Sequence, residues 1–194
     1  DYMKKVIEYL INILDYYHQK KIVNYLKDKK IQIVIDVGAH KGEYIGFINK
    51  LNPKKIYAFE PQKKIFKYLK SKYKKSKKIE MFNICISNKK KKRAFYLNEL
   101  SSTSSLMKTN NKSLWGKFKK IILNKKNILI EKIIIDTNTL DNILFPKLNA
   151  IDNILLKIDV EGAEYDVLRG AKKIINNKNV LYIQIEEAKT SIYN

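Results

Sequence analysis

Residues 31–44 read IQIVIDVGAHKGEY, in which an apolar run ends near Asp36 and is followed by Gly38 and Gly42. A strand that ends in Asp-x-Gly before a helix places its loop at the carboxyl edge of a parallel sheet, where open α/β folds bind ligands. The spacing fits neither the G-x-G-x-x-G dinucleotide loop nor a Walker loop. A carboxylate at the root of the loop would repel a pyrophosphate, but it suits a ligand that carries an ammonium group.

A second carboxylate, Glu60, ends the next apolar run, IYAFE. At the tip of a second strand this side chain can accept hydrogen bonds from both hydroxyls of a ribose. A ligand with a ribose, a cationic amino-acid arm and no phosphate is S-adenosylmethionine, which we therefore expect as the cofactor. The cofactor contacts predicted in these two loops are Asp36, Gly38, Ala39, His40, Gly42, Tyr44, Glu60 and Pro61.

Two further carboxylates, Asp159 and Glu161, follow the apolar run ILLKI and should lie at the same sheet edge. Methyl transfer to a hydroxyl requires an aligned nucleophile and a group that removes its proton. We expect Asp159 to be this base and to contact the cofactor, with Glu161, Glu164 and His40 as alternatives. For Glu164, capping of the following helix is the favoured role. No third ligand accompanies Asp159 and Glu161, so no metal site is predicted.

Cys85 and Ser87 lie near the end of a third predicted strand over residues 79–87, where they are placed to contact the adenine. For Cys85, a role as a small buried apolar residue is an equally weighted alternative. Cys85 and Ser87 are therefore also predicted to contact the cofactor.

Selection of the substrate is expected in residues 101–127, because the core strands are occupied by the cofactor. The hydroxyls of Ser104 and Ser105 suit a polyol, and the ring of Trp115 offers a surface on which a sugar can stack. The alternative for Trp115 is that it attaches an accessory helix, predicted over residues 114–122, to the core.

Apolar runs of strand length alternate with amphipathic stretches of helical spacing along the chain. Strands are predicted over residues 31–37, 56–60, 79–87, 93–98, 128–136, 154–160 and 180–186, helices over 42–51, 62–75 and 164–175, and a lysine-rich loop over 88–93. Continuous apolar strands separated by amphipathic helices indicate a parallel sheet covered on both faces. The predicted fold is therefore α/β, with a doubly wound, mostly parallel, Rossmann-like sheet and an N-terminal helical pair over residues 3–28.

The chain has 194 residues and a formal net charge of +21, which ordinarily indicates a nucleic acid or an anionic membrane as partner. Nearly all of this charge is lysine, with Arg93 and Arg169 as the only arginines, and Asn, Ile and Tyr are also abundant, as AT-rich codon use produces. Because phosphate-reading surfaces also use arginine, solvated lysine faces are the favoured interpretation. The single cysteine and the lack of a long apolar segment predict a soluble protein of a reducing, cytoplasmic compartment.

Several motifs follow one another along the chain: VIDVGAHKGEY, YAFEPQ, ISN, SSTSSL, TLDNIL, LLKIDVEGAEYDVLRGA and YIQIE. With these motifs, residues 31–187 resemble the FkbM family of S-adenosylmethionine-dependent methyltransferases. The resemblance implies a class I methyltransferase fold, methyl transfer to a hydroxyl, and acceptors that are often sugars or polyketide-type products. This chain departs from the family at Asn88, where many relatives have Asp, and it ends before the expected terminal antiparallel strands.

The predicted function is that of an O-methyltransferase that modifies a sugar, a glycan or a related small metabolite. Methylation of RNA, suggested by the charge, and a non-catalytic binding module with the same fold are the alternatives. Residues 1–30 are expected to form a helical extension and residues 31–194 a methyltransferase domain whose C-terminal part is incomplete. The whole is expected to be part of a larger multidomain chain.

Overall fold

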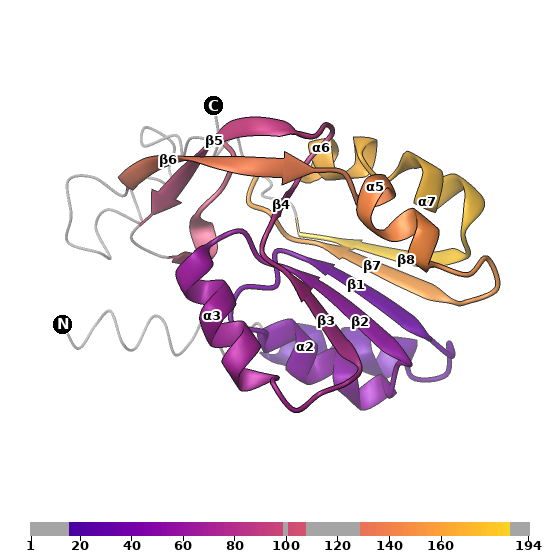
Figure 1. Ribbon diagram of the computed structural model, residues 1–194. Helices are drawn as coiled ribbons and strands as arrows, with labels where there is room; N and C mark the ends of the chain where they lie inside the picture. The colour runs from indigo at the N-terminus through magenta and orange to yellow at the C-terminus, as the bar shows by residue number, and fades with distance from the viewer. Residues whose placement is uncertain (1–15, 99–100, 108–128, 187–194) are drawn as a thin grey trace, which may run out of the picture.

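The computed structural model describes residues 16–98, 101–107 and 129–186. Its centre is a five-stranded, all-parallel sheet with the strand order β3-β2-β1-β7-β8 (Figure 1). The strands are β1 (Ile33–Val37), β2 (Lys55–Phe59), β3 (Ile79–Phe82), β7 (Ile154–Ile158) and β8 (Val180–Ile185). Every residue of β1 and β7 is buried, as expected for central strands covered on both faces. The predicted α/β class with a mostly parallel sheet is confirmed.

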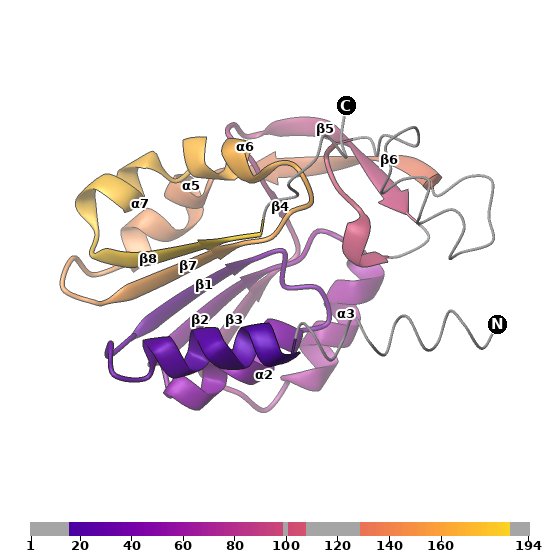
Figure 2. The ribbon, with the colours of Figure 1, turned by 180° about the vertical axis from the view of Figure 1, so that it is seen from behind.

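Helices cover both faces of this sheet (Figures 1 and 2). One layer contains the helix over residues 16–26, α2 (Glu43–Ile48), the 3-10 turn η1 (Asn49–Leu51) and α3 (Lys63–Lys72). The opposite layer contains α5 (Leu140–Leu144), the 3-10 turn η3 (Phe145–Lys147), α6 (Glu164–Arg169) and α7 (Lys172–Asn177).

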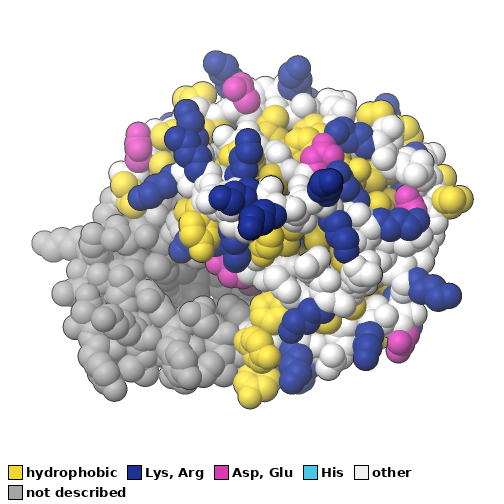
Figure 3. All heavy atoms as spheres, turned by 60° about the horizontal axis from the view of Figure 1, so that its bottom comes forward, with side chains coloured by type: hydrophobic (Ala, Val, Ile, Leu, Met, Phe, Trp, Pro, Cys, Tyr) yellow, Lys and Arg dark blue, Asp and Glu magenta, His cyan; other side chains and the backbone are white. Residues whose placement is uncertain are grey.

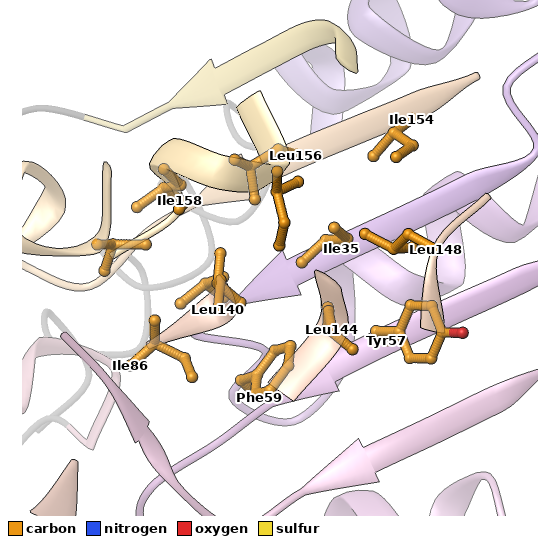
Figure 4. Packing of buried hydrophobic residues seen from close by; sticks show 14 of the residues in the cluster. Ile35, Tyr57, Phe59, Ile86, Leu140, Leu144, Leu148, Ile154, Leu156 and Ile158 are labelled. Atoms are coloured by element: carbon orange, nitrogen blue, oxygen red, sulfur yellow. The ribbon is translucent and has the colours of Figure 1, made fainter. Parts of the chain in front are cut away.

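Strand side chains alternate between two apolar cores, one beneath each helical layer. In the core under α5, α6 and α7, Ile35, Phe59 and Leu156 of the sheet pack with Leu140 and Leu144 of α5 (Figure 4). The intervening strand positions point into the other core, beneath α2 and α3. A shift of one residue in strand register would exchange the two sets of side chains, so burial on both faces specifies the register strongly.

A second sheet, with the order β4-β6-β5, was not predicted. It consists of β4 (Cys85–Ile86), β5 (Lys91–Asn98) and β6 (Leu129–Asn138), and the 3-10 turn η2 (Ser101–Thr103) follows β5. β6 pairs parallel with β4 and antiparallel with β5.

The prediction of one continuous strand over residues 79–87 is wrong. The side-chain amide of Asn83 donates hydrogen bonds to the carbonyl oxygens of Glu60 and Pro61, over 2.9 and 3.0 Å. Asn83 therefore lies between the end of β3 and the start of β4, and Cys85 belongs to the second sheet rather than to the tip of a core strand.

Two further differences from the predicted boundaries have a local structural cause. The helix predicted over residues 164–175 is divided into α6 and α7 at Gly170, where a Cβ atom would lie 2.2 Å from the carbonyl oxygen of Ser87. Only a residue without a side chain allows this approach, and glycine also weakens a continuous helix. β5 begins at Lys91, inside the predicted loop over residues 88–93, because Lys91 pairs in register with Thr137 of β6.

The described part of the N-terminal extension packs against the sheet. Val23 and Leu26 of the helix over residues 16–26 are buried in the core beneath α2 and α3. This helix therefore shares a core with the sheet, and a domain boundary at residue 30 stays a prediction. The first half of the predicted helical pair and the helix expected over residues 114–122 lie outside the described residues. Within the residues that the structure describes, no helix has the length and apolar character needed to cross a bilayer.

Candidate active site

The loop that follows β1 is held by its own backbone hydrogen bonds. The N–H groups of Gly38 and Ala39 both donate to the carbonyl oxygen of Phe59, over 3.0 and 2.9 Å, and the N–H of Gly42 donates to Ala39 over 2.8 Å. A phosphate-binding loop needs backbone N–H groups that point freely at the ligand. These three amides already have acceptors, which agrees with a ligand that lacks phosphate.

Gly38 and Gly42 are both required by the packing of this loop. Their φ angles are 88° and 75°, in the region that favours glycine. A Cβ on Gly38 would lie 1.8 Å from the carbonyl oxygen of Asp159, and a Cβ on Gly42 would lie 2.6 Å from the ring of Tyr73. The two glycines thus bring the ends of β1 and β7 together and seat the loop against α3. Their direct contact with a cofactor stays a prediction.

Glu60, directly after β2, is held with its carboxylate in a fixed orientation. It is 3% exposed, and its two oxygens accept hydrogen bonds from the backbone N–H groups of Gln62 (2.7 Å) and His40 (3.0 Å). Burial raises the pKa of Glu60 to about 7, although both hydrogen bonds act to lower it. Because a carboxylate has about four acceptor positions, each oxygen retains capacity for one further hydrogen bond. This arrangement suits a pair of neighbouring hydroxyls.

His40 and Gln62 connect this corner of the sheet to η2. The Nε2 atom of His40 lies 2.8 Å from the hydroxyl of Ser101, and its Nδ1 atom lies 3.5 Å from the carboxylate of Glu43. The side-chain amide of Gln62 donates to the carbonyl oxygen of Ser101 over 2.8 Å. Both ring nitrogens of His40 therefore have polar partners within the protein. Its role as a base or as a cofactor contact stays a prediction.

A buried lysine near the carboxyl end of β7 lies between two of the predicted site carboxylates. Lys157 is 4% exposed and pairs in register with Asp36 of β1. Its ammonium nitrogen lies 3.5 Å from Oδ1 of Asp36 and 2.9 Å from Oδ2 of Asp159. Burial alone would lower the pKa of Lys157, but the two carboxylates outweigh it and raise that pKa above its ordinary value. The three side chains therefore form a charge cluster in which Lys157 and Asp36 are buried and Asp159 is partly exposed, and we call it the Lys157 triad.

Tyr44 and Gln184 enclose the Lys157 triad from α2 and β8. The ammonium of Lys157 lies 5.2 Å from the centroid of the Tyr44 ring, a cation–π distance. The Tyr44 hydroxyl donates to Oε1 of Gln184 over 2.8 Å, and Gln184 pairs in register with Lys157. Burial raises the pKa of Tyr44 well above its ordinary value, and the charge of Asp36 adds to this. The hydroxyl is therefore a donor at neutral pH.

Asp36 and Asp159 share one ammonium but differ in access to solvent. Asp36 is 0% exposed and neither of its carboxylate oxygens has a hydrogen-bond partner within the part of the chain that the structure describes. Burial raises the pKa of Asp36, against the opposing effect of Lys157. The side chain of Asp159 is 28% exposed. Of these two carboxylates, Asp159 is the one that a ligand at the sheet edge can reach.

The loop between β7 and α6 is stabilised by Glu164 and Ser105. Oε1 of Glu164 accepts hydrogen bonds from the N–H groups of Gly162 (2.9 Å) and Val160 (3.3 Å), so this carboxylate caps the turn that leads into α6. Glu161 has a φ of 59°, and its carbonyl oxygen accepts a hydrogen bond from the Ser105 hydroxyl over 2.6 Å. Ser105 therefore attaches this loop to the chain that follows β5.

The hydroxyls predicted to contact substrate are engaged inside the protein. Ser104 and Ser105 are both buried, and the Ser104 hydroxyl accepts a hydrogen bond from the N–H of Asn98 over 3.0 Å. Trp115 lies outside the described residues. Substrate contact by these three residues stays a prediction.

Cys85 and Ser87 are both buried beside the second sheet. Cys85 packs with Phe95 and Leu106, and burial raises the pKa of its thiol to about 12, as for a small apolar residue. The Ser87 hydroxyl accepts a hydrogen bond from Arg93 over 2.8 Å. Contact of either residue with an adenine stays a prediction.

Arg93 also forms an ion pair with Asp166 of α6, over 2.5 Å. The other oxygen of Asp166 accepts a hydrogen bond from the side-chain amide of Asn88, over 2.9 Å. Asn88, the position at which the family resemblance departs, is therefore a donor to a carboxylate. An aspartate there would place a second negative charge beside Asp166.

Comparison with known proteins provides one match. A family model described as the Methyltransferase FkbM domain matches residues 36–193. The matched range runs from the end of β1 through β8 and includes Glu60, Lys157 and Asp159. No curated protein and no solved structure gives a match.

Proposed function

This chain belongs to the FkbM methyltransferase family, and from that premise we propose that it methylates a hydroxyl of a sugar or a related small metabolite, with S-adenosylmethionine as donor. The proposal is carried by one observation, the presence of Glu60 and Asp159 at the carboxyl ends of β2 and β7 in the same parallel sheet. When bound, S-adenosylmethionine supplies a methyl group on a sulfonium, which a hydroxyl oxygen can attack.

The residues at this edge fit the proposed cofactor chemically. Glu60 has acceptor capacity for two ribose hydroxyls, and Asp159 has a partly exposed carboxylate for a hydroxyl proton. Asp36 is fully buried, so we assign it an indirect role, in which it holds Lys157, and Lys157 in turn holds Asp159.

The charge at the sheet edge favours a small acceptor over a polyanion. The loops over residues 38–42, 60–62 and 159–163 contain the carboxylates of Glu60, Asp159 and Glu161 and only one lysine, Lys41. A polyanion such as RNA would meet repulsion at this edge, whereas a neutral sugar hydroxyl would not.

The proposed class of acceptor can be tested by a screen with S-adenosylmethionine against nucleotide sugars, neutral oligosaccharides and RNA. We expect turnover on a hydroxylated small acceptor, with an affinity that changes little with salt. Turnover on RNA, with affinity lost by orders of magnitude between about 50 and 200 mM salt, would replace the proposed acceptor with a nucleic acid. Cofactor binding without turnover on any acceptor would favour the non-catalytic binding module.

Glu60→Ala is expected to weaken binding of S-adenosylmethionine at least tenfold, as measured by calorimetric titration. The reason is that charge-assisted hydrogen bonds contribute about 1.5–3 kcal/mol, and the variant lacks the carboxylate that accepts them. Glu80→Ala is the matched control, because it removes a carboxylate from β3 that pairs with Lys55 and Lys147. Unchanged affinity in a folded Glu60→Ala protein would show that Glu60 does not hold the ribose.

Binding of the cofactor is also expected to depend on pH through Glu60. Because its pKa is about 7, most Glu60 side chains are carboxylates at pH 8 and most are protonated at pH 6. If only the carboxylate binds both hydroxyls, affinity should fall roughly tenfold between pH 8 and pH 6. The same titrations on Glu60→Gln should show no such step. A profile that is flat in the wild type as well would contradict this role of Glu60.

A further inference from the structure

Lysine is concentrated in one of the two helical layers. The layer with α2 and α3, together with its turns, spans residues 16–31, 41–54 and 61–78 and contains seventeen lysines and two acidic residues. The opposite layer, over residues 139–153 and 159–179, contains five basic and six acidic residues. A codon bias toward lysine would raise the number of lysines in both layers equally, so it does not explain this difference.

The highest density of lysine lies on α3 and the turn that follows it. Residues 63–78 contain nine lysines and no acidic residue, and all nine are exposed. Lys63, Lys67 and Lys70 follow a spacing of four and three, which places them in one row on the outer side of α3, whereas Leu69 is buried beneath the helix. We call the nine exposed lysines of residues 63–78 the α3 lysine face.

Figure 3 views the molecule toward the layer that contains α3 and shows many lysine and arginine side chains with few acidic ones between them. Among the described residues, no ion pair joins a carboxylate to a lysine of this face. Like charges at this density repel one another, so an external negative charge would stabilise the α3 lysine face.

We propose that the α3 lysine face binds an anionic phospholipid surface. Lys63, Lys67 and Lys70 lie in one row on the outer side of α3, which matches a flat array of headgroups, and lysine acts as a point charge there. Tyr68 lies in the same segment and is 53% exposed, and aromatic side chains of this kind favour the membrane interface. Recognition of single-stranded nucleic acid uses a basic groove with stacked aromatic rings, and duplex recognition uses arginine forks. The α3 lysine face contains no arginine.

This inference does not depend on methyl transfer, because none of the nine lysines belongs to the candidate active site. It is tested with the 194-residue chain by co-sedimentation with two kinds of vesicle, phosphatidylcholine alone and phosphatidylcholine mixed with phosphatidylglycerol. We expect binding only to the mixed vesicles, with an affinity that falls as salt rises.

The decisive variant is Lys67→Glu combined with Lys70→Glu. Each lysine near an anionic surface contributes roughly fivefold in affinity, so the loss for two should be at least about 25-fold. Lys172→Glu combined with Lys173→Glu makes the same change in net charge on the opposite layer and should alter affinity by less than about threefold. Thermal unfolding shows whether both variants remain folded.

Three outcomes would overturn the proposal. Equal losses in the two double variants would mean that binding follows net charge rather than the α3 lysine face. Equal binding to phosphatidylcholine alone would exclude an electrostatic origin. Tighter binding to duplex DNA or RNA than to the mixed vesicles at the same salt, lost in the Lys67 and Lys70 variant, would assign this face to nucleic acid instead.

Discussion

Lys157→Met is expected to lower the free energy of unfolding by about 3–5 kcal/mol at neutral pH, the range observed when one partner of a buried ion pair is removed. The methionine preserves most of the side-chain volume, so the loss measures charge rather than a cavity. Asp36 would then lie fully buried with no counter-charge and no hydrogen-bond partner among the described residues. Urea unfolding at several pH values measures the effect.

The pH dependence of this loss follows from Asp36. Burial already raises its pKa, and removal of the Lys157 ammonium would raise that pKa further. A carboxyl group with a raised pKa in the folded state binds more protons than in the unfolded state, so stability falls as pH rises from the unfolded value of about 4 through the folded value. The deficit of Lys157→Met should therefore be larger at pH 8 than at pH 5.

A double variant provides the control for this prediction. Asp36→Asn combined with Lys157→Met removes both charges, and buried pairs replaced by neutral residues often retain their stability. The double variant should recover a large part of the loss, which gives a coupling energy well above that of independent sites. A deficit below about 1 kcal/mol in Lys157→Met, or additive effects in the double variant, would mean that the triad contributes little to stability.

The parallel sheet could be predicted because two features of the sequence identify its central strands, namely an apolar run and the residues at the end of that run. The runs that become β1 and β7 are apolar except for Asp36 and Lys157, and a carboxylate followed by a glycine marks the end of each, Asp36 with Gly38 and Asp159 with Gly162. A strand buried on both faces has no polar alternation, so this pattern indicates a central parallel strand. The positions of Glu60 and Asp159 at one edge then follow from the topology alone, since parallel strands end together.

The Lys157 triad was not predicted, although the position of Lys157 in the sequence indicates that this lysine needs a partner. A lone lysine inside the apolar run ILLKI has to be paired when the strand is buried, because lysine is almost never buried alone. Its partners could not be identified, because Asp36 lies more than a hundred residues away and their pairing depends on the register of β1 against β7. The same reasoning applies to Gln184, which becomes a site neighbour only through the register of β8.

The second sheet could not be predicted because β5 pairs with β6, a segment far from it in the sequence, and the ends of β3 and α6 depend on single long-range contacts. Asn83 ends β3 through bonds to backbone carbonyls more than twenty residues earlier, and Gly170 admits the carbonyl of Ser87. Neither contact produces a periodic pattern in the sequence. Hydrophobic periodicity alone therefore continues the strand over residues 79–87 and the helix over residues 164–175 past their true ends.

The Lys157 triad has a direct consequence for catalysis, because Lys157 holds the proposed base. The ammonium donates a hydrogen bond to one oxygen of Asp159 over 2.9 Å, and this fixes the orientation of the carboxylate at the sheet edge. The other carboxylate oxygen of Asp159 is then available to accept the proton of an attacking hydroxyl. A general base has to be held within hydrogen-bond reach of that proton, and a charge-assisted bond on its far side provides such positioning.

Asp159→Asn is accordingly expected to lower kcat by at least about 100-fold, since a positioned general base contributes about 10²–10⁴. The amide keeps the shape of the side chain and an oxygen that can accept the Lys157 hydrogen bond, so the variant should fold. Affinity for S-adenosylmethionine should change much less, because Glu60 is intact. A loss that appears equally in kcat and kcat/KM identifies an interaction made only in the transition state, so both constants are measured on the acceptor that the screen identifies.

Glu161→Gln is the matched control and should retain most of the turnover. If Asp159→Asn abolishes cofactor binding, Asp159 is a cofactor anchor and the base is Glu161 or His40, and near wild-type turnover would mean that alignment of the hydroxyl alone suffices for transfer.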